Sequence, residues 1–270
     1  MRFSTGVCSD SHTTQKNVMD RISLKRAFTR ETVPPWLCPA CGKGILQLKK
    51  DSFLQGERAH TRDHSHEFFE PEWIEYTYAC LFECSNNHCK EIISSTGTGS
   101  VDWDVICGED GEPEQNYKDY FRPKYFEPPL RIIDIPEPCP ESVSTPIKES
   151  FRLLFVSPSA AANNIRIAIE NLLTELKIKR FNLAKGKRQF VPLHFRITLI
   201  PEKYKDLKEM LLAIKWLGNS GSHDHDAMTI DDVFDAYELA EHVLKEIYEP
   251  KLHKLNALAK KVNKKKGPAK

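Results

Sequence analysis

Apolar residues in the second half of the chain recur every three or four positions, the spacing that places them on one face of a helix. This spacing predicts helices within residues 146–155, 157–178, 201–218 and 229–248. A bundle buries such faces against one another, and four helices are enough to form one. The second half of the chain is therefore predicted to be a helical bundle.

The first half follows another pattern, in which short β-rich runs surround two pairs of cysteines. The run "ILQL" follows the first pair, "WIEYTYACLF" precedes the second pair, and "EIISSTG" follows it. This order of turns and strands is that of a zinc ribbon, which we predict over residues 36–106. A ribbon of this size is expected to bury little core, so a bound metal would supply much of its folding energy.

The cysteine spacing favours a metal site over disulfides. Two residues separate Cys38 from Cys41, four separate Cys84 from Cys89, and 42 lie between the two pairs. Each spacing closes a tight turn that can bring two thiolates to one ion. The sequence offers no open coordination position and no general base for a catalytic metal. These four cysteines are therefore the predicted ligands of a structural zinc ion.

Other cysteines and histidines of the chain are alternative metal ligands. Cys80 and His88 are alternatives because they lie close to the second pair, although a strand cysteine that faces inward is more often simply buried. Three histidines lie between the two cysteine pairs: His60, His64 and His66. They could hold a second metal ion, but a polar loop between strands accounts for them without a metal. The remaining cysteines have no partner at ligand spacing and are expected to be plain thiols: Cys8, Cys107 and Cys139.

Residues 107–145 are dense in proline, which disfavours a helix or a central strand. Because aromatic and aliphatic residues accompany the prolines, the segment is expected to pack along the helical domain as an extended arm. The predicted units are an N-terminal extension (1–35), the zinc ribbon (36–106), the arm (107–145), the helical domain (146–250) and a basic tail (251–270).

The net charge of +1 is the sum of an acidic N-terminal half and a basic C-terminal half. Residues 67–119 contain 13 acidic and two basic side chains, whereas residues 171–205 contain nine basic and two acidic ones. This asymmetry favours an anionic partner for the second half of the chain. The last twenty residues carry eight lysines and no acid, which a solvated tail explains equally well.

One stretch between the second and third predicted helices interleaves cations with aromatic rings. Its cations are Lys179, Arg180, Lys185, Lys187 and Arg188. Phe181 and Phe190 lie among them. Cations neutralise phosphates and aromatic rings stack on bases, so RNA or another polyanion is the predicted ligand. A surface loop anchored by two phenylalanines would show the same pattern.

Nothing in the sequence indicates a membrane protein. No stretch approaches the roughly 18 consecutive apolar residues of a membrane span, and the N-terminal residues lack the apolar core of a secretory signal. Eight cysteines without a disulfide pattern fit reducing surroundings. The protein is therefore expected in the cytoplasm, with no membrane partner.

The loop "WLGNSGSHDHDAM", residues 216–228, crowds histidines and aspartates between the third and fourth predicted helices. Gly218 is expected to end the third helix with a positive φ. Thr229 and Asp232 are expected to form a capping box for the fourth. The alternating "HDHD" could ligate a metal, but no distant ligand set accompanies it. Asn219 and His223 are left without a structural role.

Three motifs of the second half resemble a bacterial helical domain of unknown function in the HEPN (higher eukaryotes and prokaryotes nucleotide-binding) superfamily. They are "IRIAIENLLTEL", "AIKWLGNSGSHD" and "TIDDVFDAYELAEHVL". The "LGN-x-x-x-H" element is the most recognisable of them, and the resemblance covers roughly residues 120–250. A zinc ribbon and a proline-containing linker are frequent companions of this domain.

The resemblance implies a four-helix HEPN-like bundle that often forms a homodimer, in proteins of prokaryotic defence and toxin systems. Many HEPN proteins are metal-independent ribonucleases that use an arginine placed shortly ahead of a histidine. His223 matches that histidine and Asn219 matches an asparagine of the helical-domain family. No arginine stands just ahead of His223, which leaves Lys215 and Arg166 as the candidate cations.

The lack of an arginine shortly ahead of His223 matters for RNA cleavage, because the reaction needs a cation. Metal-independent cleavage uses the ribose 2′-hydroxyl as nucleophile, a histidine as acid or base, and a cation to stabilise charge on the phosphate. Lysine lacks the planar fork of arginine, so the expected alternatives are weak RNA cleavage and RNA binding without cleavage.

The sequence thus predicts a mainly α protein, a four-helix HEPN-like bundle with a small N-terminal β zinc ribbon. Its predicted function is to bind RNA or another phosphate-bearing ligand, with or without cleavage. The alternative is a non-catalytic interaction subunit of a defence or regulatory complex.

Overall fold

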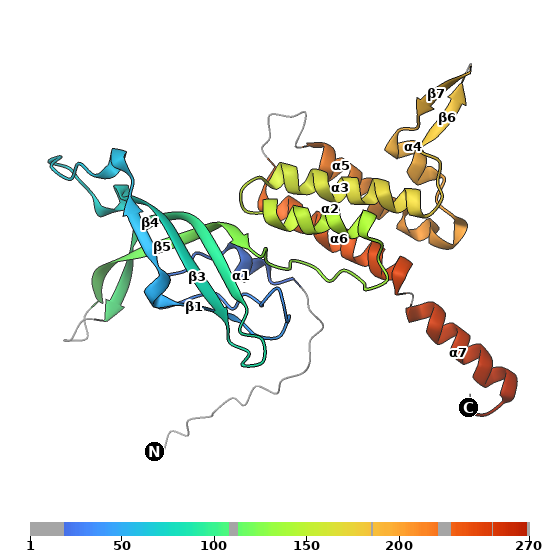
Figure 1. The fold of residues 1–270 in the computed structure, drawn as a ribbon, viewed down its shortest axis with the longest axis horizontal. Helices are drawn as coiled ribbons and strands as arrows, with labels where there is room; N and C mark the ends of the chain where they lie inside the picture. The colour runs from blue at the N-terminus through green and yellow to red at the C-terminus, as the bar shows by residue number, and fades with distance from the viewer. Residues whose placement is uncertain (1–18, 108–112, 185, 221–227, 250, 269–270) are drawn as a thin grey trace, which may run out of the picture.

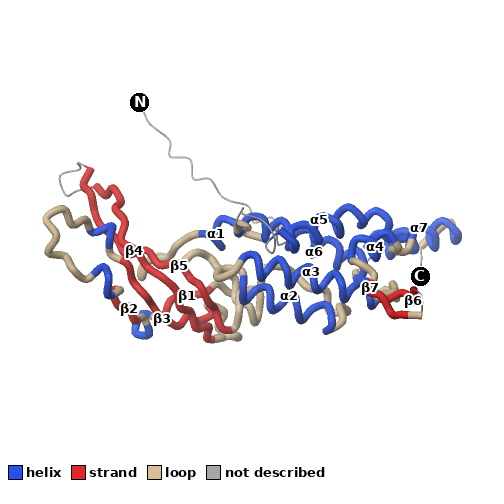
Figure 2. The backbone as a smooth tube through the Cα atoms, turned by 90° about the horizontal axis from the view of Figure 1, so that it is seen from above, coloured by secondary structure: helices blue, strands red, loops and turns tan. Residues whose placement is uncertain are grey.

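The structure, a computed structural model, describes residues 19–107, 113–184, 186–220, 228–249 and 251–268. These residues form a strand-rich part and a helical part, which follow one another along the long axis of the molecule (Figures 1 and 2). We call residues 19–127 the β lobe and residues 141–268 the helical lobe. Residues 128–140 join the two lobes.

The β lobe is built on one curled antiparallel sheet. Its strands are β1 (Leu46–Leu48), β2 (Leu54–Glu57), β3 (Glu75–Cys84), β4 (Ile92–Cys107) and β5 (Pro113–Glu127). β1 and β2 pair with successive parts of one edge of β3, while β4 lies between β3 and β5. Three short 3-10 helices lie between β1 and β3: η1 (Lys50–Ser52), η2 (Ala59–Thr61) and η3 (Pro71–Trp73).

The predicted fold class, mainly α with a small ribbon, is wrong. Helices account for 43% of the chain and strands for 25%. Much of the additional strand content is β5, which lies in the segment predicted to pack along the helical domain as an arm. Proline is tolerated here because β5 is the last strand of the sheet, and Pro123 lies beside a register shift at Thr96/Gly97.

The β lobe buries an aromatic core, so the expectation of a ribbon with little core is also wrong. Six aromatic residues of this core are almost completely buried: Phe28, Trp36, Tyr78, Phe82, Phe121 and Phe126. The rings of Phe28 and Tyr78 meet edge to face with centroids 5.4 Å apart, and those of Trp36 and Phe126 with centroids 5.3 Å apart. Phe28 and Trp36 precede the first strand, and Phe121 and Phe126 belong to β5. The sheet therefore has a substantial aromatic core in addition to the two cysteine turns.

The N-terminal helix α1 (Arg21–Lys25) contacts the helical lobe. Arg21 Nη2 lies 2.8 Å from carboxylate oxygens of both Asp235 and Glu238, and Lys25 Nζ lies 2.8 Å from Asp231. The backbone of the same segment pairs with β5 through Phe28 and Phe121. Residues that were predicted to be an extension thus connect the sheet to the helical lobe.

The helical lobe contains α2 (Glu141–Leu153), α3 (Pro158–Glu175), α4 (Leu193–Thr198), α5 (Lys208–Ser220), α6 (Ile230–Tyr248) and α7 (Lys251–Lys265). The 3-10 helix η4 (Glu202–Leu207) precedes α5. α2, α3, α5 and α6 correspond to the four predicted amphipathic segments and pack against one another. Within the described residues, no helix is long and apolar enough to cross a membrane.

Gly218 does not end its helix, contrary to the prediction. It lies inside α5, which continues to Ser220. A Cβ atom at this position would lie 2.6 Å from Arg166 Cβ and 3.1 Å from the carbonyl oxygen of Ala162, both on α3. Glycine is required here because α3 and α5 approach closely, a reason that cannot be seen in the local sequence.

The predicted capping box at the start of α6 is confirmed. The Thr229 side chain accepts a hydrogen bond from Asp232 N, and the Asp232 carboxylate accepts one from Thr229 N at 2.8 Å. The Thr229 hydroxyl and the Thr229 backbone N–H both donate to the Asp232 carboxylate and hold its pKa below its ordinary value. The cap therefore fixes the point at which α6 begins, shortly after residues 221–227, which lie outside the described residues.

Replacing Thr229 with alanine is expected to lower the free energy of unfolding by about 1 kcal/mol, since an N-cap hydrogen bond is lost. Urea unfolding followed by circular dichroism measures the change. Thr229→Ser keeps the hydroxyl and should unfold like the wild type. Equal destabilisation by both substitutions would contradict the capping role.

Candidate metal centre and nucleic-acid interface

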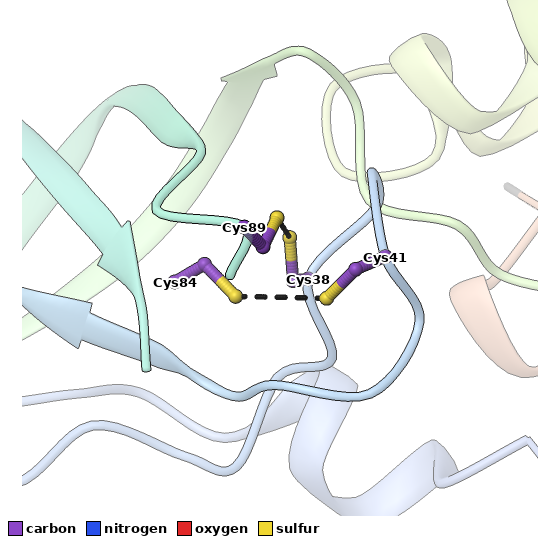
Figure 3. Close-up of side chains that lie close together, drawn as sticks. All are labelled: Cys38, Cys41, Cys84 and Cys89. Carbon is purple, nitrogen blue, oxygen red and sulfur yellow. Dashed lines mark hydrogen bonds between the residues drawn. The ribbon is translucent and has the colours of Figure 1, made fainter. Parts of the chain in front are cut away.

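The four predicted zinc ligands meet at one end of the sheet. Their sulfur atoms all lie within 4.8 Å of one another (Figure 3). Cys38 and Cys41 come from the turn before β1, Cys84 ends β3, and Cys89 lies in the turn before β4. The antiparallel pairing of Leu46 with Cys84 places the two turns side by side.

The distances within the cluster suit tetrahedral coordination. Cys38 Sγ lies 3.8 Å from Cys89 Sγ, and Cys41 Sγ lies 3.6 Å from Cys84 Sγ. Sulfur atoms bound tetrahedrally to one ion at about 2.3 Å are about 3.8 Å from each other. Sulfurs of a disulfide are far closer, about 2.0 Å apart. The cluster is therefore compatible with a metal ion held by four thiolates.

Backbone conformation allows the two turns to approach. The residue after the second cysteine of each turn has a positive φ: 61° at Gly42 and 52° at Lys90. Between the turns, a Cβ atom on Gly44 would lie 2.5 Å from Cys84 Sγ and 2.9 Å from the Asn86 nitrogen. Only glycine fits at position 44 without moving one turn away from the other.

Amide groups surround the sulfurs and set their acidity. Gly44 N donates to Cys41 Sγ at 3.4 Å, and the N–H groups of Gly44 and Lys43 lower the pKa of Cys41 to about 6. Burial raises the pKa of Cys84 to about 12, although Asn86 N donates to its sulfur. A cation among four sulfurs would favour the thiolate at each of them.

The structure distinguishes the four ligands from their alternatives. Cys80 is buried within β3, where burial raises its pKa to about 12, and it is not part of the cluster. His88 is exposed at the tip of the second turn. Among the described residues, no other group of histidines, cysteines and acids could hold a metal ion. His60 and His64 instead lie near single glutamates, Glu75 and Glu57 respectively.

The basic stretch between α3 and α4 forms a hairpin, which we call the basic hairpin (residues 179–190). Its strands β6 (Phe181–Ala184) and β7 (Lys187–Phe190) pair only with each other. The hairpin projects from the end of the helical lobe that is farthest from the β lobe (Figures 1 and 2). Of its five predicted ligand-binding cations, only Lys185 lies outside the described residues.

Cations and rings alternate on the basic hairpin. The rings of Phe181 and Phe190 meet edge to face with centroids 5.9 Å apart, and the Arg188 guanidinium lies 3.8 Å from the centre of the Phe181 ring. Arg180 lies 5.8 Å from the centres of both rings. Phe190 is 48% exposed and Leu183 is 82% exposed. The hairpin thus presents arginine planes, ring surface and positive charge to solvent.

The base of the hairpin is held by a buried arginine that no local sequence pattern marks. Arg196, on α4, is completely buried, and burial lowers its pKa. It donates to the carbonyl oxygens of Glu170 and Ile178 and to the Thr174 hydroxyl. These acceptors lie at the C-terminal end of α3, where a cation is favourable. Arg196 therefore connects the chain before the hairpin to the chain after it.

The predicted catalytic residues are only partly within the described chain. Asn219 lies in the last turn of α5 and is half-buried, while His223 lies outside the described residues. The neighbouring His225, Asp224 and Asp226 lie outside them as well, so the structure does not describe the "HDHD" stretch.

The two candidate cations lie on helices that pack against each other. Arg166 packs against Gly218, and burial together with the charge of Arg166 lowers the pKa of Lys215. Arg166 is also engaged within α3, since its guanidinium contacts Glu170 and donates to Asn163 Oδ1 at 2.9 Å. Lys215 Nζ lies 3.1 Å from the centre of the Trp216 ring. The packing of α3 on α5 thus brings Arg166 to the C-terminal part of α5, which also carries Lys215.

Two domain families match the chain, and both are described as domains of unknown function. DUF8608 matches residues 26–126 and DUF4145 matches residues 148–265. The first match follows the β lobe, including Phe28 and most of β5, and the second follows the helical lobe. No curated protein and no solved structure matches the chain. The families therefore support a division into two lobes and carry no statement about activity.

Proposed function

We propose that the protein binds single-stranded RNA through the basic hairpin, and that zinc bound by the four cysteines stabilises the β lobe. The observation that supports RNA binding is the hairpin itself, a projecting element on which arginines lie against phenylalanine rings. Exposed ring surface and guanidinium planes stack on unpaired bases, which a duplex does not offer.

Charge supports the same ligand. The described cations of the hairpin form no ion pair with an acid among the described residues: Lys179, Arg180, Lys187 and Arg188. Their charge is therefore available to phosphates, which bind by releasing counterions. The exposed lysines of α7, such as Lys260 and Lys261, extend the positive surface of the helical lobe.

Zinc is the proposed ion because four thiolates at tetrahedral distances are the usual ligands of structural zinc. All four positions of the ion would be taken by sulfur, so no site for substrate or water would remain. The metal would then act on stability alone, and RNA would be bound at the far end of the molecule.

Replacing both Lys187 and Arg188 with glutamine is expected to weaken RNA binding about tenfold or more at low salt. The slope of log affinity against log salt should become shallower by about 1.4, since each phosphate contact with single strands contributes about 0.7. Fluorescence anisotropy with labelled mixed-sequence RNA measures both quantities. Lys203→Gln with Lys205→Gln removes two exposed charges from η4 of the same lobe and should change neither by as much.

If wild type and the hairpin variant retain RNA equally, or if neither retains it, the hairpin is not an RNA interface. Equal retention by both would place RNA binding on another surface, whereas retention by neither would favour an interaction subunit without nucleic-acid ligand.

RNA cleavage is a second candidate function, supported by the packing of Arg166 against Gly218 of α5, three residues after Lys215. A cation at this point could stabilise charge on a phosphate while His223 transfers a proton. The resemblance to HEPN ribonucleases adds Asn219 and His223 as the partners of that cation.

Incubation of wild type and His223→Ala with mixed RNA in the presence of a chelator tests cleavage. Activity in the wild type that falls at least about 100-fold in the variant is expected if His223 acts as acid or base. Gel electrophoresis of the RNA products measures the cleavage activity. Equal inactivity of both proteins would rule out this cleavage and leave RNA binding by the basic hairpin as the proposed function.

A further inference from the structure

A cavity lies at the junction of the two lobes, away from the basic hairpin. It occupies about 590 Å³ between the turn that carries Cys38 and Cys41, the joining segment 128–135 and α2. Small-molecule sites typically enclose about 300–1,000 Å³ and often form where domains meet. The cavity has the size and position of a small-molecule site.

Apolar side chains form the floor of the junction cavity. Pro128 and Pro129 begin the joining segment, Ile133 follows them, and Phe151 reaches the cavity from α2. Ile133 is 3% exposed and Phe151 is 6% exposed, so both are held firmly by the core. Proline fixes the backbone beside them. The floor is therefore preformed and suited to an apolar body.

Cations form the rim. Arg131, Lys148 and Arg152 line the cavity together with a single acid, Glu149. The side chains of Arg131 and Arg152 are 48% and 43% exposed. The rim thus has an excess of positive charge over an apolar floor.

The rim cations differ in how far neighbouring acids neutralise them. Arg131 Nη2 lies 2.7 Å from Asp134, and Arg152 contacts Glu127 and Glu149. No acid of the described chain lies within ion-pair distance of Lys148. Lys148 is therefore the rim charge most available to an incoming anion.

We infer that the junction cavity binds a small amphipathic organic anion, a compact apolar or aromatic body that carries a carboxylate, sulfonate or phosphate. The apolar body would lie on the proline and isoleucine floor, and the anion would face Lys148. Both lobes contribute to the cavity, so the bound ligand would stabilise their arrangement. This site is independent of the basic hairpin and of the proposed RNA binding.

Anilinonaphthalene sulfonate is a suitable probe because it combines an aromatic body with one sulfonate and fluoresces when its surroundings become apolar. Titration of the folded, metal-loaded protein is expected to show about one site. N-phenylnaphthylamine, which has the same ring system without the sulfonate, is expected to bind about tenfold more weakly or worse.

Two substitutions locate the site. Lys148→Glu should weaken the sulfonate probe about tenfold and leave the neutral probe nearly unchanged. Lys50→Glu makes the same charge change on η1, outside the cavity, and serves as the matched control. Thr145→Trp places a large side chain at the cavity wall and should weaken both probes, while circular dichroism confirms that the helices are retained.

Equal binding of the charged and neutral probes, unaffected by Lys148→Glu, would overturn the assignment of an anion. Sulfonate binding that Thr145→Trp and Lys148→Glu both leave intact would place the probe elsewhere and overturn the cavity. Because Lys148 is exposed, its substitution is informative even if Thr145→Trp does not fold.

Discussion

Replacing Cys84 with serine is expected to reduce the zinc content from about one ion per chain to well below one. Serine at this position offers a hydroxyl instead of a thiolate, which binds zinc far more weakly. The three remaining cysteines would have to hold the ion with one ligand position taken by water. Elemental analysis of protein purified without added chelator measures the zinc content.

Cys80→Ser is the matched control because both cysteines are buried residues of β3. Cys80 lies outside the cluster, so its substitution should lower stability through the loss of a buried sulfur while about one zinc ion per chain is retained. Loss of zinc in both variants to the same degree, or the absence of zinc from the wild type, would contradict the proposed site.

Metal loss should loosen the two cysteine turns without unfolding the sheet. The rings of Phe28 and Phe121 pack against each other with centroids 5.6 Å apart, and most of the buried cluster around them is aromatic or aliphatic, although Cys38 and Cys84 belong to the same cluster. Near-ultraviolet circular dichroism of the Cys84→Ser protein is therefore expected to keep most of its aromatic signal. Complete unfolding would show that the core depends on the ion, as in the smallest zinc domains.

Replacing Arg196 with methionine is expected to lower the free energy of unfolding by about 3 kcal/mol. The change leaves the carbonyl oxygens of Glu170 and Ile178 and the Thr174 hydroxyl without their buried donor. Each buried acceptor left unpaired costs about 1–3 kcal/mol, while methionine recovers part of the lost packing. Chemical unfolding followed by helix content measures the change.

The same substitution should affect RNA binding, since Arg196 holds the chain on both sides of the basic hairpin. Without Arg196 the hairpin would sample more conformations, and ordering it on binding would lower the affinity for RNA. Arg152→Met is the control for stability, because Arg152 is an exposed ion-paired arginine whose loss should cost about 1 kcal/mol or less. A stability loss at Arg196 no larger than that at Arg152 would contradict the role of the buried hydrogen bonds.

Features that depend on neighbouring residues in the chain could be predicted well. The four amphipathic segments became α2, α3, α5 and α6, since a helix satisfies its hydrogen bonds locally. The capping box of Thr229 and Asp232 formed for the same reason. The two cysteine pairs were also recognisable, because each pair closes a turn within its own six residues or fewer.

Features that depend on distant residues could not be predicted. β5 is a strand because it pairs with β4. Its prolines favoured an extended arm in the sequence analysis, but proline is also tolerated in a strand at the edge of a sheet. Gly218 was assigned to a helix end, but its role is to let α3 reach α5. Arg196 had no local signal at all, because its acceptors lie between 18 and 26 residues away along the chain.

The sequence by itself determined the helical segments, the caps and the pairs of cysteines, because their stabilising contacts lie within a few residues. The tertiary structure decided that β5 completes a curled sheet and that Arg166 of α3 packs against Gly218 of α5. It also excluded Cys80 as an alternative ligand, since the sulfurs of the four predicted cysteines meet without it. Each of these outcomes rests on contacts between residues far apart in the chain, whose pairing only the folded arrangement specifies.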